Sequence, residues 1–177
     1  MRVADAIADW LAEKKIVTAF GIIGGGNVVL FDAIQAKGAT RIVCTHHEQA
    51  AAMASCYHNR TTGSLSSVVL CTTGAGSTNT ITGVMAAYMD SIPLLVISGN
   101  DPWKYMYAKT RVWGTQAYGS SEVAKGFTKH SERFDGPFID AGHVHMRLTV
   151  ARTLATDARQ GPVWVDICKD VQNADCR

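Results

Sequence analysis

One carboxylate stands alone in the first half of the chain. Glu48 is the only acidic residue between Asp32 and Asp90, and it follows a short apolar run at residues 41–44. The Ala-rich segment 50–54 that comes after it has strong helix propensity. We therefore expect Glu48 where a buried strand turns into a helix, the edge at which ligands bind to open parallel sheets. An acid in apolar surroundings needs a strong hydrogen-bond donor, although the same residue also fits a first-turn acid that satisfies free backbone N–H groups.

Glycine-rich loops follow two further predicted strands. Residues 21–26 come after the run 16–20, and residues 72–79 come after the run 67–72. If the strands are parallel, these loops and the segment 45–49 line one crevice, where glycines let a ligand approach the backbone closely. Neither loop matches the dinucleotide or P-loop fingerprint. Each loop taken singly also fits a tight turn between strand and helix.

Histidines and cysteines offer weaker candidates for chemistry. His46 and His47 lack the i, i+4 spacing of a zinc-binding helix, and the segment 143–145 is no better. We therefore expect no metal ligands here. Cys44 and Cys71 end predicted strands, where small buried thiols are more typical than nucleophiles. The five cysteines contain no Cys-x-x-Cys pair, which indicates reduced, mostly buried thiols in a cytosolic protein.

Composition limits the class of protein. The 177 residues, of which 47% are hydrophobic and 18% charged, predict one globular domain over residues 1–177. A net charge of +2 without a Lys/Arg block argues against a nucleic-acid partner. Polar residues and glycines interrupt the weakly charged region 61–89, which excludes it as a membrane span. Residues 1–5 lack the apolar core of a signal peptide, so we expect a cytoplasmic protein.

Apolar runs and helical patterns alternate along the chain. Strands are predicted at residues 16–20, 42–44, 67–72, 93–98, 127–134 and 162–167. Helices are predicted around residues 3–11, 28–37, 48–60, 81–88, 121–125 and 143–159, with Asn27 capping the second and Gly38 ending it. Residues 101–118 are expected to be irregular. Because most of the strands are continuous apolar runs, we predict an α/β fold, a doubly wound, mostly parallel six-stranded sheet with helices on both faces.

Several motifs in order resemble a known family. The runs 47–54 (HEQAAAMA), 72–79 (TTGAGSTN) and 87–94 (AYMDSIPL) resemble the thiamine-diphosphate enzymes of the acetolactate synthase group, and the segments 128–130 and 161–172 extend the match. The similarity covers nearly the whole chain. It is to the N-terminal, pyrimidine-binding domain of that family.

The resemblance assigns roles to particular residues. It implies that Glu48 is catalytic, because a glutamate at this position bonds N1′ of the cofactor's aminopyrimidine ring and favours the tautomer that removes the thiazolium C2 proton. Gln116 falls where the family has an active-site glutamine and is the second catalytic candidate. The cofactor-binding residues that the resemblance implies are Gly24, Gly25, Glu48, Gly74, Ala75 and Asn79. This chain departs from the family at Ile22, Ile23 and Ala75, which leaves the substrate open.

The resemblance also implies that these residues carry only half of the family's active site. The family binds the cofactor's diphosphate through Mg²⁺ in another domain that carries Gly-Asp-Gly, a sequence absent from these residues. Either these residues are a fragment of a longer protein, or the enzyme is split between two polypeptides. We expect a split enzyme acting on 2-oxo acids or aldehydes, in which a partner subunit holds Mg²⁺ and the complex is a heterotetramer. The predicted helix with Met85, Tyr88 and Met89 is then either an interface or ordinary core.

Two other classes remain open from the sequence. A non-catalytic assembly or regulatory module derived from such a domain is the main alternative. A domain binding NAD or FAD through the glycine turns is disfavoured, because Cys44 and Thr45 stand where an acidic ribose contact is required. The sequence does not decide between decarboxylation and carboligation.

Overall fold

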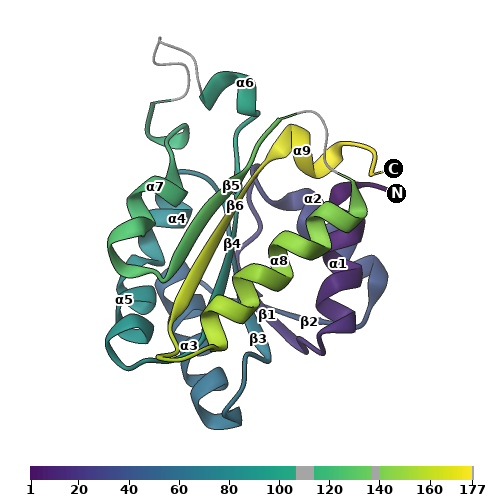
Figure 1. The fold of residues 1–177 in the computed structure, drawn as a ribbon. Coiled ribbons are helices and arrows are strands. Elements are labelled where there is room, and N and C mark those ends of the chain that lie inside the picture. The colour runs from purple at the N-terminus through teal and green to yellow at the C-terminus, as the bar shows by residue number, and fades with distance from the viewer. Residues whose placement is uncertain (107–113, 137–139, 177) are drawn as a thin grey trace.

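Six parallel strands form one sheet between two layers of helices, as predicted (Figure 1). The computed structural model of the chain describes residues 1–106, 114–136 and 140–176. The strand order is β2-β1-β3-β4-β6-β5, and every neighbouring pair is parallel. The prediction of an α/β, doubly wound, parallel sheet is therefore confirmed.

The elements follow one another in near-regular alternation. The strands are β1 (Thr18–Gly21), β2 (Arg41–Cys44), β3 (Ser67–Cys71), β4 (Leu94–Asn100), β5 (His130–Phe134) and β6 (Pro162–Cys168). The helices are α1 (Val3–Glu13), α2 (Val28–Lys37), α3 (Glu48–Thr62), α4 (Ala75–Asn79), α5 (Ile81–Met89), α6 (Trp103–Met106), α7 (Ser120–Ala124), α8 (Ala141–Thr156) and α9 (Lys169–Asn173). Two 3₁₀ turns, η1 (Gly114–Gln116) and η2 (Lys125–Phe127), complete the order.

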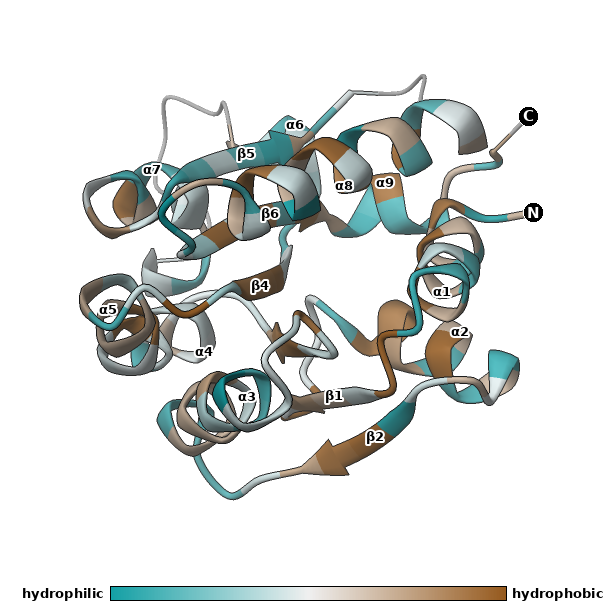
Figure 2. Ribbon diagram, turned by 60° about the horizontal axis from the view of Figure 1, so that its bottom comes forward, coloured by the Kyte–Doolittle hydropathy of each residue, from teal (hydrophilic) through white to brown (hydrophobic). Residues whose placement is uncertain are grey.

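Alternate residues of the central strands face two separate cores. Val68 and Leu70 of β3 pack with α1, α2 and α8, whereas Val69 and Cys71 pack with α3 and α5. This is the period of two that a strand imposes on its side chains. Trp10, which is fully buried, anchors the first core. Figure 2 shows the sheet between the two helical layers, with α1 and α2 against one face and α3 and α5 against the other.

The chain reverses its direction of growth at β1, the strand next to the edge of the sheet. Strand β1 pairs with β2 on one side and with β3 on the other. Helix α2 therefore connects β1 to the edge strand β2, and α3 connects β2 back to β3 on the other side of β1. The two helices lie on opposite faces of the sheet (Figure 1). Such a reversal separates the loops at the carboxyl ends of the adjacent strands and opens a binding crevice there.

Four local expectations were wrong or incomplete. Strand β2 is not buried, because it is the edge strand and Cys44 at its end is exposed. The strand predicted at 127–134 begins only at His130, since η2 occupies the preceding residues. The irregular segment 101–118 contains α6 and η1, and its residues 107–113 lie outside the described residues. The short helix α9 after β6 was not predicted.

The two ends of the described chain lie side by side (Figure 1). The Val3 backbone N–H donates to the carbonyl of Ala174 at 3.0 Å, and the Cys176 N–H donates to the carbonyl of Met1 at 2.7 Å. Within the described residues, none of the helices combines the length and the apolar character that crossing a bilayer requires.

Candidate functional site

The loops after β1 and β3 meet around one threonine at the end of the sheet. The Gly26 backbone N–H donates to the Thr72 hydroxyl at 3.0 Å. A Cβ placed on Gly24 or on Gly76 would come within 2.6 Å of the Thr72 side chain. Both glycines are therefore required by the close packing of two loops against Thr72. Sequence reasoning placed Thr72 in this loop without singling it out.

Glu48 lies beside this junction, at the start of α3. Its helix is capped by His47, whose ring Nδ1 accepts a hydrogen bond from the Gln49 N–H at 3.2 Å. The Glu48 side chain is half-buried, and its Oε2 accepts a hydrogen bond from the Asn79 amide Nδ2 at 3.0 Å. The structure thus brings together two predicted site residues that are 31 positions apart in the chain.

The second oxygen of Glu48 is available to a ligand. In the part of the chain that the structure describes, no hydrogen bond reaches Oε1. A Cβ on Gly76 would lie 2.6 Å from the Thr72 side chain and 3.5 Å from this oxygen, so Gly76 brings α4 close to both Thr72 and Glu48. A carboxylate with one oxygen held by an amide and the other open can accept from, or share a proton with, a ligand N–H group.

Gln116 lies over the turn that connects β3 to α4. Its Oε1 accepts a hydrogen bond from the Thr73 hydroxyl at 2.8 Å. Gly74 has φ +61°, and a Cβ there would lie 2.5 Å from Gln116 Oε1 and 2.9 Å from the Thr115 carbonyl. The structure therefore brings Gln116 against Gly74, on the far side of the α4 turn from the glycine loop of residues 24–26. Gln116 is exposed and sits on the rim of the site.

The other predicted glycine positions differ in their surroundings. The Gly24 N–H donates to the side-chain Oδ1 of buried Asn27 at 2.7 Å, and Asn27 Nδ2 donates to the Ile22 carbonyl at 3.1 Å. Asn27 therefore closes its own loop and does not cap α2 with its side chain, contrary to prediction.

Gly25 is exposed, and a Cβ there would meet nothing within 4 Å. The loop of residues 21–26 is also held by buried Gln172 of α9, whose side-chain amide donates to the Gly26 carbonyl at 2.6 Å.

A pocket opens beside the Gly74 turn. It has a volume of about 470 Å³, and the residues around it are Gly74, Ala75, Thr78, Thr115, Tyr118 and Val123. Ala75, predicted to contact the cofactor, is exposed and lines this pocket. The site therefore combines a carboxylate on one side of α4 with an open, small-residue wall on the other.

Tyr118 joins the pocket wall to the turn, a residue that sequence reasoning missed. Its hydroxyl donates to the Gly74 carbonyl at 3.0 Å and is also hydrogen-bonded to the Ser77 hydroxyl. Burial raises the pKa of Tyr118, so the hydroxyl keeps its proton and acts as a donor at neutral pH.

A second carboxylate, Asp166, lies fully buried in β6. It accepts hydrogen bonds from the Ser98 hydroxyl at 2.6 Å and from the Asn100 amide at 2.7 Å, and the Arg133 Nε lies 3.6 Å away. Burial raises the pKa of Asp166, and these partners oppose the shift. Asn100 also donates to the Tyr118 carbonyl at 3.0 Å, so this network holds the segment that carries the pocket wall.

Over residues 1–106, 114–136 and 140–176, no group of three or more His, Cys, Asp or Glu side chains could hold an ion. His46 and His47 are both exposed.

Comparison with known proteins identifies the family. Residues 1–121 match the family described as thiamine pyrophosphate enzyme, N-terminal TPP binding domain. The chain is 33% identical over 175 residues to the acetolactate synthase large subunit of Haemophilus influenzae, and 34% identical over 177 residues to the isozyme 3 large subunit of Escherichia coli K12. Each alignment covers 96% of this chain and 28% of the relative. A chloroplastic acetolactate synthase of Arabidopsis thaliana is 31% identical over 172 residues, which are 96% of this chain and 24% of that protein.

The matched stretch includes both loops of the site, the Glu48–Asn79 pair and the Gly74 turn. The chain spans about a quarter of the length of these relatives. It belongs to the thiamine pyrophosphate enzyme family, as an N-terminal cofactor-binding domain of the acetolactate synthase group.

Proposed function

We propose that this domain binds the aminopyrimidine ring of thiamine diphosphate at Glu48 and supplies one half of an active site that acts on 2-oxo acids. The observation that carries the proposal is the contact between Glu48 Oε2 and the Asn79 amide at 3.0 Å, located where the sheet reverses its direction of growth. That edge is the usual ligand site of an open parallel sheet.

The chain's part in the reaction is to hold a proton. Asn79 holds Oε2 of Glu48, so Oε1 would be the oxygen that shares a proton with a ring nitrogen of the bound cofactor. Thiamine diphosphate supplies the nucleophilic carbon that adds to the 2-oxo group. Gly76 and Gly74 let Thr72 and Gln116 pack closely against α4 beside Glu48, and exposed Ala75 adds only a methyl group to the pocket wall. Gln116, on the rim, is positioned to contact the substrate.

The diphosphate end of the cofactor requires residues from elsewhere. The 177 residues contain no Gly-Asp-Gly, and the described ones contain no metal-binding cluster. We propose that a second polypeptide holds Mg²⁺ and the diphosphate, and that two copies of each chain form a heterotetramer. A cytoplasmic location is part of this proposal.

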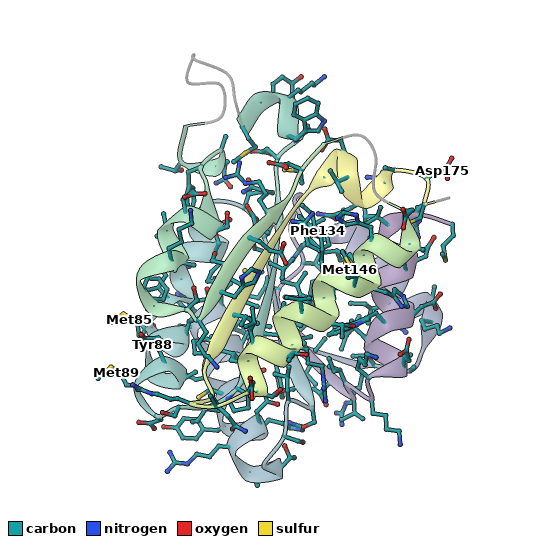
Figure 3. All side chains as sticks on the ribbon, in the orientation of Figure 1. Met85, Tyr88, Met89, Phe134, Met146 and Asp175 are labelled. Carbon is teal, nitrogen blue, oxygen red and sulfur yellow. The ribbon has the colours of Figure 1, made fainter. Side chains whose placement is uncertain are left out.

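Helix α5 offers a surface for that assembly. Met85 and Met89 are 48% and 71% exposed, and Tyr88 is half-buried. Figure 3 shows the three side chains along the outer side of α5, at the border of the molecule. Their exposure favours the interface interpretation over ordinary core, because large apolar side chains gathered on a surface mark contact sites.

The names of the relatives support a proposal for the reaction. Those reported above are named acetolactate synthases, and we propose carboligation or decarboxylation of 2-oxo acids of that type, a transferase or lyase activity. The departures at Ile22, Ile23 and Ala75 leave the identity of the donor and acceptor to experiment.

A binding titration tests the proposal. The purified chain is titrated with thiamine diphosphate and Mg²⁺, with and without a second polypeptide that carries Gly-Asp-Gly, and tryptophan fluorescence reports binding. We expect tight binding and turnover of a 2-oxo acid only in the mixture. Full activity of this chain alone would overturn the two-polypeptide arrangement. Assembly with the second chain without cofactor binding would instead support the non-catalytic module.

A further inference from the structure

A chain of hydrogen bonds connects the two halves of the sheet edge through Tyr118. On one side, the Tyr118 carbonyl accepts from Asn100, which is 1% exposed and also donates to Asp166. On the other side, the Tyr118 hydroxyl donates to the Gly74 carbonyl at 3.0 Å and is bonded to Ser77. Tyr118 thus connects the buried carboxyl ends of β4 and β6 to the first turn of α4.

The Gly74 carbonyl is where α4 begins. It accepts the backbone N–H groups of Ser77 at 3.1 Å and Thr78 at 3.2 Å, and the Ser77 hydroxyl lies 3.0 Å from it. A helix of five residues has few internal hydrogen bonds of its own, so its direction depends on contacts at its ends. Tyr118 makes such a contact at the first end, and Asn79 lies at the last.

Asn79 is the residue that holds Glu48. Its Nδ2 lies 3.0 Å from Glu48 Oε2, and a Cβ on Gly76, on the same turn, would lie 3.5 Å from Glu48 Oε1. A small rotation of α4 about its first turn therefore changes the distance between Asn79 and Glu48. A misplacement of this kind affects a reaction that depends on a defined proton position.

We propose that Tyr118 is a positioning residue, whose hydroxyl fixes the direction of α4 and thereby keeps the Asn79 amide against Glu48. This inference rests on the proposed function, because it concerns the carboxylate that bonds the cofactor ring. Asp166 and Asn100 hold the backbone of Tyr118, so the buried network of the other half-sheet supports the reactive carboxylate without touching the ligand.

The first test uses the full chain without cofactor. Tyr118→Phe removes one hydroxyl and keeps the ring in the pocket wall. Amide hydrogen exchange of Ser77 and Thr78 should become about threefold to tenfold faster, the range expected when one hydrogen bond is lost. Tyr57→Phe removes the same group from an exposed tyrosine of α3 and should leave these rates unchanged. Unchanged exchange in Tyr118→Phe would overturn the proposal.

The second test uses the assembled enzyme and a double-mutant cycle. Tyr118→Phe should lower kcat about tenfold with little change in the substrate KM, and Asn79→Ala should lower it at least as much. Because both act through one contact, the double variant should be no slower than Asn79→Ala alone. Strictly multiplicative losses would mean that Tyr118 does not act through Asn79.

The two proposals fail in different ways. If Glu48→Gln retains the rate, the proposed function fails, while the exchange measurement still reports on Tyr118. If Glu48→Gln abolishes activity but Tyr118→Phe changes neither exchange nor kcat, only the positioning role is lost.

Discussion

Two carboxylates lie near the carboxyl ends of parallel strands, and their surroundings are opposite. Glu48 follows the edge strand β2, is half-buried, and has one oxygen bonded to Asn79. Asp166 lies in β6, between β4 and β5, and has no exposed surface. Its register neighbours across the sheet are Ser98 and Arg133, and both side chains contact it.

The difference shows that position in the sheet, more than residue type, separates an acid with an open side from an acid enclosed by its partners. A strand with neighbours on both sides surrounds its side chains with partners, and a buried acid there is satisfied by them. An acid that follows an edge strand keeps an open side. The cysteines at the ends of the same two strands differ in exposure in the same way: Cys44 at the end of β2 is exposed and Cys168 at the end of β6 is buried.

The largest expected effect is on catalysis and follows from Glu48→Gln in the assembled enzyme. The amide keeps an oxygen for Asn79 but cannot share a proton with the ring, so the rate should fall by roughly 10²–10⁴-fold. Because the side chain is half-exposed, the free energy of unfolding should change by less than about 0.5 kcal/mol. Steady-state kinetics and urea denaturation measure the two quantities. Glu13→Gln, at an exposed position of α1, is the control, and a near-native rate for Glu48→Gln would remove the acid from the mechanism.

Asp166→Ala, in contrast, should strongly lower the free energy of unfolding. It removes the acceptor of the Ser98 hydroxyl and the Asn100 amide inside a dry core. The loss of one partner from a buried charged network costs about 3 kcal/mol or more of the free energy of unfolding. Urea denaturation checks this value against Asp9→Ala, which breaks only an exposed pair with Lys37 and should cost less than about 1 kcal/mol. Equal losses in the two variants would show that Asp166 is not the structural acid of the comparison.

Most of the fold was predictable from the sequence. Continuous apolar runs predicted the parallel sheet, and the left-handed Gly38, φ +69°, ends α2 as expected. The exposure of β2 was not predictable from its residues 41–44, because apolar runs look alike at the edge and in the centre of a sheet. Only the strand order decides which strand has a single neighbour.

The site was predictable in part, and for a physical reason. Glu48 stood out as a lone acid at a strand end, and Asn79 was named only through the family resemblance, as a cofactor-binding residue. Its contact with Glu48 was not predicted. Tyr118 and Asp166 gave no signal, because their roles depend on strand register and on a loop that returns to the Gly74 turn. Contacts of that kind are set by the tertiary structure and leave no local pattern in the sequence.

The pH dependence of stability tests the burial of Asp166 more finely. Because burial raises its pKa above 3.8, the folded state binds this proton more tightly than the unfolded state does. The contribution of Asp166 is therefore fully present below about pH 4 and is lost as pH rises through the folded pKa. The difference in unfolding free energy between the native protein and Asp166→Asn should therefore fall over this window. Urea titrations at a series of pH values measure it, and a difference that stays level or rises with pH would contradict the assignment.

The smallest effect is a difference in thiol reactivity between the ends of β2 and β6. Burial raises the pKa of Cys56, Cys71, Cys168 and Cys176, and a thiol reacts through its thiolate. At pH 8 a soluble disulfide reagent should therefore label Cys44 rapidly and the other four thiols only as the protein unfolds, with all five reacting in denaturant. Cys44→Ser should remove the fast phase and leave the slow one. Rapid labelling of Cys168 in the folded protein would mean that the end of β6 is as open as that of β2, and the contrast between the two carboxylates would lose its structural basis.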